Sequence, residues 1–572
     1  MKFDTLLKML IVIISLMLSL FSFDNVYAKS VYIEGYIPHP KSPETKVEKV
    51  YLFIDQGRIV KKSTEPFGVA SSTQKILESA TGPLLLSSGF IDLHGHLKYH
   101  AVSLWSDAQG QFDNRFHWRG KSSYKTNVSS LLNNEALGTS SDPNSLLCQT
   151  YQYAEIKALA GGVTSVQGVG NDMGCTAGIL ARNVEIETDY EDTKDIRVST
   201  EMVAPNITKL FQEVVFPKMI SEKKSFDDVY NATTVDERSI MAQSTQDFFL
   251  GLRTSYLEYF QRMMPLGDLR TLIAHLSEGK AADQYNRLEY KLIKALGMAQ
   301  KGLVIIHGVG LDAADLKHAA QNKMSIVWSP FSNLLLYGET LDVKQALDFN
   351  INLTLGADWS PSGSKNLLDE VKIAKTYLQK NNRRVVSDRL LYNMMTINPA
   401  KALKLDHKIG QLEENYLADI VAFRLKSQKI NPYTQIIDSE VSDIQFVMVG
   451  GELKIAQKAI GEHENNADYL ITKKDSADCE SEKSIMTLNT PIKMTDLEKN
   501  LLTVFPKLDS VTGCNDQNYK NVRENVFKET WGQISSPLST TIEKKNYDIL
   551  ENQLSIINQP ELELNIFLKD TK

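Results

Sequence analysis

The sequence predicts an α/β protein whose main body is a distorted TIM-type (β/α)8 barrel. Between residues 85 and 406, short apolar runs that read as buried strands alternate with helical stretches, for example over 285–301 and 312–322. In several runs a histidine or an acid lies at or just past the end of the apolar stretch, as in 89–96, 272–278, 304–308 and 353–358. In a barrel, the carboxyl ends of all strands meet on one face. We therefore expect these side chains to converge on one site.

The rest of the chain flanks this barrel. At 572 residues the chain is long enough for two or three domains. Residues 29–84 and 407–458 contain short runs of β character, which we expect to pair as one small discontinuous β-sandwich domain. Residues 459–572 are polar and charged. They are predicted to form a C-terminal extension with helices near 494–504 and 544–557, and the sequence does not indicate its role.

Residues 1–28 have the pattern of a signal peptide. Two lysines precede the apolar stretch over 9–23, and small residues follow at 26–28. The apolar stretch is shorter than the roughly 20 residues of a membrane-spanning helix. We expect cleavage between Ala28 and Lys29 and export to the periplasm or the medium, with no stable membrane insertion afterwards. An uncleaved anchor is the alternative.

Four cysteines suit an oxidising compartment, where disulfides persist. They allow three pairings, of which Cys148–Cys175 with Cys479–Cys514 is favoured because each pair falls within one predicted domain. Four buried thiols are the alternative. None of the four has the Cys-x-x-Cys spacing of a zinc site.

The composition is that of a globular protein, with 42% hydrophobic and 23% charged residues. The net charge of -7 includes no basic excess, which argues against nucleic acid and anionic membranes as partners. A small-molecule substrate is the expected partner.

The strand-end residues have the chemistry of metal ligands. His94 and His96 are two positions apart, so in an extended strand both face one side. Imidazole and carboxylate are ligands that zinc and iron accept. A single strand-end histidine is more often structural, and Asp358 alone could be a turn residue or a helix cap. The order and regular spacing of the strand ends favour a metal site.

These motifs resemble those of the amidohydrolase superfamily, specifically the mononuclear deaminase-like branch with cytosine deaminase, guanine deaminase and the triazine hydrolases. The resemblance covers about residues 30–455. The family's His-x-His matches His94 and His96, its His-x-x-Glu matches His275 and Glu278, its sixth-strand histidine matches His307, and its eighth-strand aspartate matches Asp358.

The resemblance implies one divalent metal ion, zinc or iron. Its ligands would be His94, His96, His275 and Asp358. The catalytic residues would be Glu278, His307 and Asp358, with a metal-activated water attacking an sp² carbon that carries nitrogen. Substrate contacts are predicted for Trp359, Asn333 and Trp105.

One departure from the wider family concerns the number of metals. Binuclear members carry a lysine on strand four, and the matching segment 196–203 has none. This difference favours one metal. Glu201 could serve as a bridging acid instead, so a second metal remains open.

Residues 97–134 form a long segment rich in aromatic residues and arginine, between the first strand and its helix. Loops on this face of a barrel shape substrate pockets. Two interpretations remain open: a lid that stacks on the substrate, or a small packed subdomain.

The leading prediction is an exported metal-dependent hydrolase of non-peptide carbon–nitrogen bonds that deaminates a cyclic amidine or heterocycle. One alternative is a binuclear-type amidase or dipeptidase that cleaves an N-acyl or dipeptide-like amide. Another is a catalytically silent scaffold, which the complete ligand set disfavours. The sequence names neither the substrate nor the metal, and the resemblance suggests a homo-oligomer.

Overall fold

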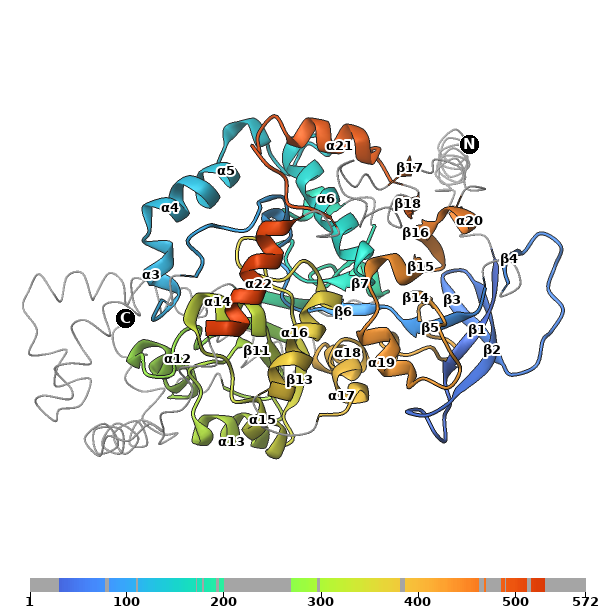
Figure 1. Ribbon diagram of the computed structural model, residues 1–572, viewed down its shortest axis with the longest axis horizontal. Helices are drawn as coiled ribbons and strands as arrows, with labels where there is room; N and C mark the ends of the chain where they lie inside the picture. The colour runs from blue at the N-terminus through green and yellow to red at the C-terminus, as the bar shows by residue number, and fades with distance from the viewer. Residues whose placement is uncertain are drawn as a thin grey trace, which may run out of the picture.

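The computed structural model describes residues 30–77, 82–109, 112–170, 172–176, 180–191, 195–199, 269–295, 299–380, 386–461, 468–469, 485–488, 490–511 and 516–529. The leader expected at 1–28, Glu201, Cys479, Cys514 and the helix expected near 544–557 lie outside these residues. Within them, an α/β region adjoins a large sheet (Figure 1).

Parallel strands form the centre of the α/β region. One ladder contains β6 (Phe90–Asp92), β7 (Val163–Val166) and β8 (Arg182–Asn183); the other contains β9 (Asp195–Ser199), β10 (Leu269–Leu276), β11 (Leu303–His307), β12 (Ser325–Trp328) and β13 (Asn352–Leu355). Neighbouring strands in both ladders run parallel. Every residue of β11 is buried, as expected for a strand with both faces covered. The strands lie in two ladders, and closure of a complete ring remains a prediction.

Helices alternate with these strands along the chain. They include α6 (Leu146–Ala160), α12 (Gln284–Ala295), α13 (Ala313–Gln321), α14 (Pro330–Tyr337), α15 (Val343–Asp348), α16 (Leu367–Lys380), α17 (Asp388–Asn393) and α18 (Ile397–Ala402). The helix predicted over 312–322 is α13, which begins with a capping box between Asp312 and Asp315. The helix predicted over 285–301 corresponds to α12, which the structure describes over Gln284–Ala295.

The second body is a ten-stranded sheet built from both ends of the chain. Its order is β17-β18-β16-β15-β14-β5-β1-β2-β3, with β4 paired to β1. The N-terminal strands are β1 (Val31–Pro38), β2 (Val47–Asp55), β3 (Arg58–Ser63), β4 (Gln74–Ile76) and β5 (Leu84–Ser88). The later ones are β14 (Ile420–Arg424), β15 (Ile444–Val449), β16 (Glu452–Gln457), β17 (Asp468–Tyr469) and β18 (Ile485–Thr487).

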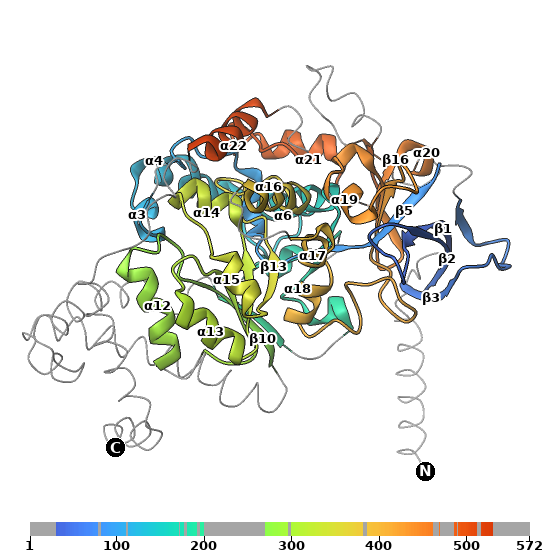
Figure 2. The ribbon, with the colours of Figure 1, turned by 60° about the horizontal axis from the view of Figure 1, so that its bottom comes forward.

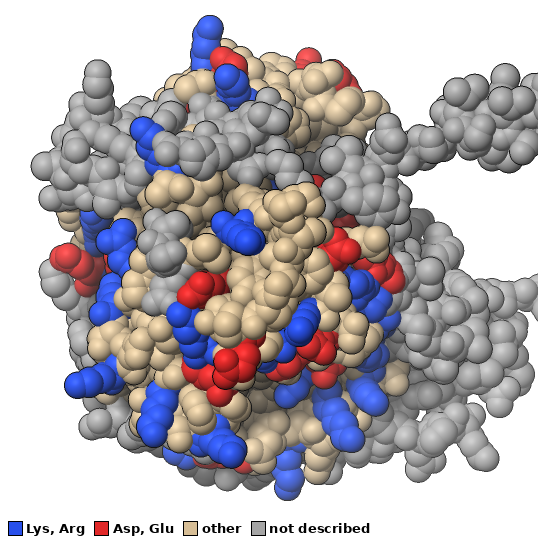
Figure 3. All heavy atoms as spheres, turned by 90° about the vertical axis from the view of Figure 1, so that its right-hand side faces the viewer, with Lys and Arg blue, Asp and Glu red and all other residues tan. Residues whose placement is uncertain are grey.

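The two groups of strands join where β5 pairs antiparallel with β14. The strands form one sheet where we expected a sandwich, and β17 and β18 add strands from beyond residue 458. Acidic and basic side chains lie side by side on the face shown in Figure 3. Lys62 of β3 also pairs with Glu413 at 2.9 Å. α19 (Pro432–Ile437) and α20 (Lys458–Gly461) flank the sheet.

Residues 97–137 form a series of short helices after β6. These are η1 (Leu97–Ala101), α3 (Arg115–Arg119), α4 (Ser122–Tyr124), η2 (Lys125–Ser129), α5 (Ser130–Leu132) and η3 (Glu135–Leu137). Their aromatic side chains are largely inside: Trp105, Phe112 and Trp118 are all buried in the main core. This burial supports the packed-subdomain interpretation.

The C-terminal part of the chain returns to the α/β region. α21 (Met494–Leu501) corresponds to the helix predicted over 494–504, whereas α22 (Gln517–Glu529) was not predicted. Both helices lie along the face formed by α6, α14 and α16 (Figure 2).

The predicted disulfide between Cys148 and Cys175 is confirmed. It ties the start of α6 to the loop after β7. Among the helices that the structure describes, none is long and apolar enough to cross a membrane.

Candidate metal centre

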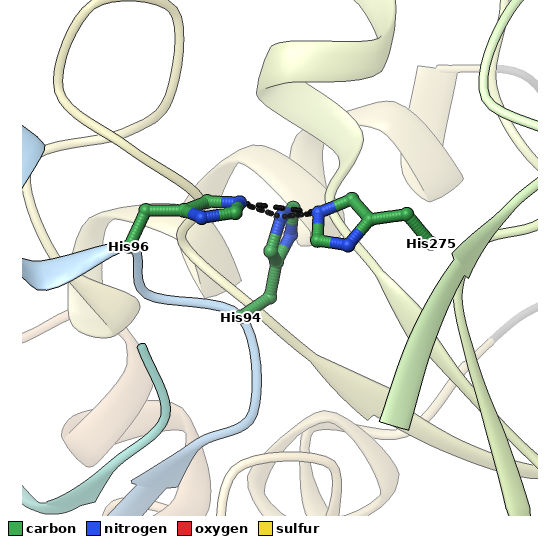
Figure 4. A group of neighbouring side chains, drawn as sticks. All are labelled: His94, His96 and His275. Atoms are coloured by element: carbon green, nitrogen blue, oxygen red, sulfur yellow. Dashed lines mark hydrogen bonds between the residues drawn. The ribbon is translucent and has the colours of Figure 1, made fainter. Parts of the chain in front are cut away.

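Three histidines predicted as ligands meet at the carboxyl ends of β6 and β10. Figure 4 shows their imidazole rings pointing at one another. The Nε2 atoms of His94, His96 and His275 lie 3.0–3.1 Å apart in all three pairs. A neutral imidazole has one N–H, so three such nitrogens cannot all be hydrogen-bonded to each other. The arrangement instead presents three lone pairs to a common point.

The acidic residues predicted for the site lie beside these histidines. Asp358 follows β13, and its Oδ1 is 3.1 Å from Nε2 of His94 and 3.7 Å from Nε2 of His96. At the end of β11, Nε2 of His307 lies 3.7 Å from Oε2 of Glu278, which follows β10. The six predicted catalytic and metal-ligating residues are therefore together, and their individual roles remain predictions.

The geometry of this group suits a divalent metal. Three nitrogens at these separations can all lie about 2 Å from one point, which is the zinc–nitrogen bond length. His94, His96 and His275 form one set of converging ligand atoms, and His94, His307 and Asp358 form another. Three imidazoles with one carboxylate are a donor set that zinc and iron accept.

Electrostatics at the centre also favour a bound cation. Burial lowers the pKa of His96 to about 3, with further lowering by His94, and burial brings the pKa of His275 well below its usual value. Both rings are therefore neutral and offer lone pairs. Burial opposes a charge on His94 too, but Asp358 raises the pKa of His94 above its usual value. Burial likewise opposes ionisation of Asp358, yet His94 keeps the pKa of that carboxyl low. The negative charge of Asp358 therefore stabilises one positive charge next to His94.

Two hydrogen bonds orient the histidine rings. Oγ of Ser329, the residue after β12, lies 2.8 Å from Nδ1 of His94. Oδ1 of Asn333 lies 2.8 Å from Nδ1 of His307, while its Nδ2 donates to Thr340. With Nδ1 of each ring engaged in this way, Nε2 is left to face the centre. Within the described residues, Nδ1 of His275 has no such partner.

A further carboxylate joins the strand ends on which the ligands lie. Oδ1 of Asp92 accepts the backbone N–H of His94 at 2.9 Å, and the Asp92 carboxylate also accepts that of Ala357 at 3.3–3.4 Å. Asp358 in turn donates its own backbone N–H to the carbonyl of His94 at 2.8 Å. The ends of β6 and β13 are thereby held together, and with them His94 and Asp358.

Glu278 is held by residues from two other segments. Tyr337 of α14 donates its hydroxyl to Oε1 of Glu278 at 2.5 Å, and Nε1 of Trp118 donates to the Tyr337 oxygen at 2.9 Å. Burial opposes ionisation of Glu278, but His307 and Arg115 lower its pKa below the usual value, aided by Tyr337. Glu278 is therefore a carboxylate at neutral pH.

Arg115 also supports the turn that carries Glu278. It pairs with Glu289 through two bonds of 2.5 and 3.1 Å, and Glu289 accepts the backbone N–H of Ser277 at 2.7 Å. Arg115 and Trp118 belong to the segment after β6, so this packed segment supports the site directly.

The open side of the centre lies at His96. The His96 side chain is 21% exposed, whereas those of His94 and Asp358 are 0% and 5% exposed. Trp359 lies on this side, with its ring 6.1 Å from that of His96 and 4.8 Å from that of Tyr99. This position is compatible with the substrate contact predicted for Trp359.

The other two predicted substrate contacts are less accessible. Trp105 is 3% exposed, and its ring stacks on Phe112. Asn333 is fully buried, and both of its polar side-chain atoms have protein partners, as described above. Asn333 orients His307, and a contact of either residue with substrate remains a prediction.

The backbone of the site is strained at four positions. His96, Ser277, His307 and Asp358 have φ values of 50°, 55°, 72° and 61°. This left-handed region costs an L-residue on the order of 1–2 kcal/mol. Close packing adds a further constraint, because a Cβ on Gly356 would lie 2.5 Å from Cβ of His94.

The sequence assigned no supporting role to Asp92, Arg115, Trp118, Glu289, Ser329 or Tyr337, although four of them fall within motifs or segments that it singled out. Asp92 and Ser329 carried a usable signal, since each lies at or directly after the end of a buried strand. The others act through contacts between distant segments, for which the sequence carried no local signal.

Comparison with known proteins gives two kinds of similarity. Residues 256–454 match the amidohydrolase family model. The 5-methylthioadenosine/S-adenosylhomocysteine deaminase of Pyrococcus horikoshii is 30% identical over 179 residues, which are 30% of this chain and 42% of that protein. The deaminase of the same name from Clostridium tetani is 27% identical over 202 residues, or 34% of this chain and 47% of that protein. The chain thus spans less than half the length of these curated relatives.

Solved structures extend the similarity of the fold over most of the chain. An adenosine deaminase from Xanthomonas campestris with bound zinc has a TM-score of 0.53 at 14% identity, covering 87% of this chain and 99% of that one. Atrazine chlorohydrolase from Arthrobacter aurescens complexed with zinc has a TM-score of 0.55 at 18% identity, covering 83% and 100%.

These likenesses indicate a TIM-barrel-like α/β fold, as the sequence predicted. The family match includes the segment that carries His275, Glu278, His307 and Asp358. By this match, residues 256–454 of the chain are similar to the amidohydrolase family.

Proposed function

We propose that this chain is an exported, metal-dependent hydrolase of non-peptide carbon–nitrogen bonds that deaminates a cyclic amidine or heterocycle. The observation that carries the proposal is the convergence of three Nε2 atoms within 3.0–3.1 Å, with Asp358 and Glu278 beside them. Sequence relatives named as deaminases of 5-methylthioadenosine and S-adenosylhomocysteine support the choice of a purine-like heterocycle.

His94, His96, His275 and Asp358 would hold one divalent ion. When bound, such an ion lowers the pKa of a coordinated water toward about 7 and so supplies a nucleophile at neutral pH. β9 contains no lysine, which supports one metal rather than two. Zinc in the two structural neighbours makes zinc the first metal to test, with iron as the alternative.

Glu278 would move the protons of the reaction. It starts as a carboxylate, so Oε2 can accept a proton from the nucleophilic water and deliver it to the leaving nitrogen. Tyr337 occupies Oε1, which leaves Oε2 on the side of His307. His307 and Asp358 would orient the attacking water, since Nδ1 of His307 is fixed by Asn333.

The disulfide Cys148–Cys175 supports the export part of the proposal, because such bonds persist in oxidising compartments. Mass spectrometry of the protein from the producing cells tests it. An N-terminus at Lys29 in the periplasm or medium is expected, and a full-length cytoplasmic chain would refute export.

The test of function has two steps on chain purified without added metal or chelator. Elemental analysis should find about one zinc or iron per chain. Ammonia release is then measured on 5-methylthioadenosine, S-adenosylhomocysteine and other amino-substituted heterocycles, with Glu278→Gln as the matched inactive control. Two metals per chain, with amine released from N-acyl or dipeptide-like amides, would favour the binuclear amidase alternative. A chain without metal would leave the scaffold alternative.

A further inference from the structure

The described residues of the C-terminal segment, 485–488, 490–511 and 516–529, pack on loops that leave the predicted metal centre. Leu508 forms an isolated β-bridge with Val102, and Asp509 donates its backbone N–H to the carbonyl of Ala101 at 3.0 Å. Ala101 and Val102 follow His96 in the segment after β6. Further along, the ring of Tyr519 in α22 lies 5.5 Å from that of Phe331 in α14. Figure 2 shows α21 and α22 side by side with α6 and α14.

Asp509 lies at the centre of this contact. It is 0% exposed, and its two carboxylate oxygens accept from two buried lysines, Lys157 of α6 and Lys365, the latter at 2.5 Å. Lys365 also pairs with Asp516 at 2.7 Å. Two lysines are thus balanced by two aspartates, and both aspartates come from the C-terminal segment.

One of these lysines reaches the loop of a predicted metal ligand. The ammonium group of Lys157 donates to Oγ of Ser360, two residues after Asp358. Oγ of Ser360 also lies 3.0 Å from Nδ1 of His100, in the loop that leaves His96. Ser360 therefore links the two loops that carry Asp358 and His96.

Two backbone hydrogen bonds connect the two ends of the loop around Ser360. Gly363 donates to the carbonyl of Trp359 at 2.5 Å, and Ser364 donates to that of Ala357 at 3.1 Å. A shift at Ser360 is therefore transmitted to Asp358. A buried ammonium group is stable only when paired, so the position of Lys157 depends on Asp509.

We propose that Asp509 is a positioning residue for the metal centre, which holds Lys157 against Ser360 and thereby fixes the loop that presents Asp358. Through Asp509, the C-terminal segment would help to hold a metal ligand of the barrel in place. The proposal rests on the metal site of the proposed function.

The test compares three variants of the full chain. Asp509→Asn removes the charge that holds Lys157, and Ser360→Ala removes the hydroxyl that Lys157 contacts. Arg523→Gln is the matched control. It breaks the 2.8 Å pair of Arg523 with Asp369 between α22 and α16, but it keeps the contacts of Lys157. Each protein is stripped and reloaded with Co²⁺. The visible spectrum reports ligand geometry, competition with a chelator gives the Kd, and thermal unfolding gives the Tm.

We expect Asp509→Asn and Ser360→Ala to raise the Kd for Co²⁺ at least about tenfold and to change the spectrum, as loss of outer support does at metal sites. Arg523→Gln should change the Tm only. If Asp509→Asn does not fold, Ser360→Ala decides the question. Spectra and Kd values equal to those of Arg523→Gln would overturn the proposal while leaving the metal site intact. A wild-type chain that binds no Co²⁺ would instead overturn the proposed function, and the positioning role with it.

Discussion

Oγ of Ser329 lies 2.8 Å from Nδ1 of His94, and this contact orients the ring so that Nε2 faces the centre of the site. His94 is shared by both sets of converging ligand atoms, so its orientation affects every other ligand. The serine is the N-terminal cap position of α14, directly after β12, and is fully buried. The β12–α14 junction thus orients a ligand that comes from β6.

Ser329→Ala should weaken metal binding. Loss of an outer hydrogen bond to a ligating histidine typically costs about 10–100-fold in metal affinity. The Kd for zinc, measured by chelator competition, checks this. Ser332→Ala is the matched control, because Oγ of this buried serine in the same helix has no hydrogen-bond partner among the described residues. Equal affinities in the two variants would show that Ser329 does not support His94.

Glu278→Gln should keep its metal and lose turnover. The change leaves the metal-ligating residues in place but removes the group that accepts a proton, and general acid–base catalysis contributes about 10²–10⁴-fold. Metal content and kcat on the same preparation test the two halves separately. Full activity of this variant would remove Glu278 from the mechanism.

Tyr337→Phe should move the acid limb of kcat/KM to higher pH. The wild-type pKa of Glu278 is lowered by His307 and Arg115 against the effect of burial, and the Tyr337 hydroxyl adds to that lowering. Without this donor the pKa of Glu278 rises, and the carboxylate is protonated at a higher pH.

The lowered pKa of Glu278 also makes the stability of the fold depend on pH. A carboxyl with a lowered pKa stabilises the fold above its unfolded pKa, and that contribution is lost as pH falls through the folded value. The Tm deficit of Tyr337→Phe should therefore be largest near neutral pH and shrink in acid. Tyr290→Phe is the control, because this buried tyrosine bonds His318 at 2.9 Å and does not contact Glu278. Identical pH profiles in both variants would contradict the role of Tyr337.

Replacing Cys148 and Cys175 together by serine should destabilise the chain by about 3–4 kcal/mol. The two residues are 27 positions apart, and closing a loop of this length restricts the unfolded chain by about that free energy. Urea unfolding of the oxidised wild type and the double variant measures the difference. Peptide mapping without reductant should recover Cys148 linked to Cys175. Equal unfolding midpoints would mean that the bond is absent or adds nothing.

The convergence of the candidate metal ligands could be predicted from the sequence because its signals are local. His94, His275, His307 and Asp358 each end or follow a short apolar run, and parallel strands bring such ends together whatever the intervening chain does. The pairing of N-terminal and C-terminal strands was predictable for a similar reason, since both groups carried clear β character.

Other features depend on partners far apart in the chain. Lys157 and Asp509 are 352 positions apart, and neither has a neighbouring pattern that indicates a buried ion pair. Tyr337 gave no sign of its contact with Glu278, because its neighbours in α14 are all buried and show no distinct face. The helix α22 was missed because its polar sequence reads as exposed until Tyr519 packs on Phe331. Burial of polar residues is set by tertiary packing, which local patterns do not contain.

The left-handed backbone at His96, Ser277, His307 and Asp358 bears on how this chain can change over time. Glycine adopts that conformation without steric strain, although its greater freedom in the unfolded chain offsets part of the gain in stability. At His96, His307 and Asp358, glycine would remove this strain together with a side chain that the proposed chemistry needs. In a homologue that had abandoned hydrolysis, glycines at these sites would be the trace of that loss, readable without any assay.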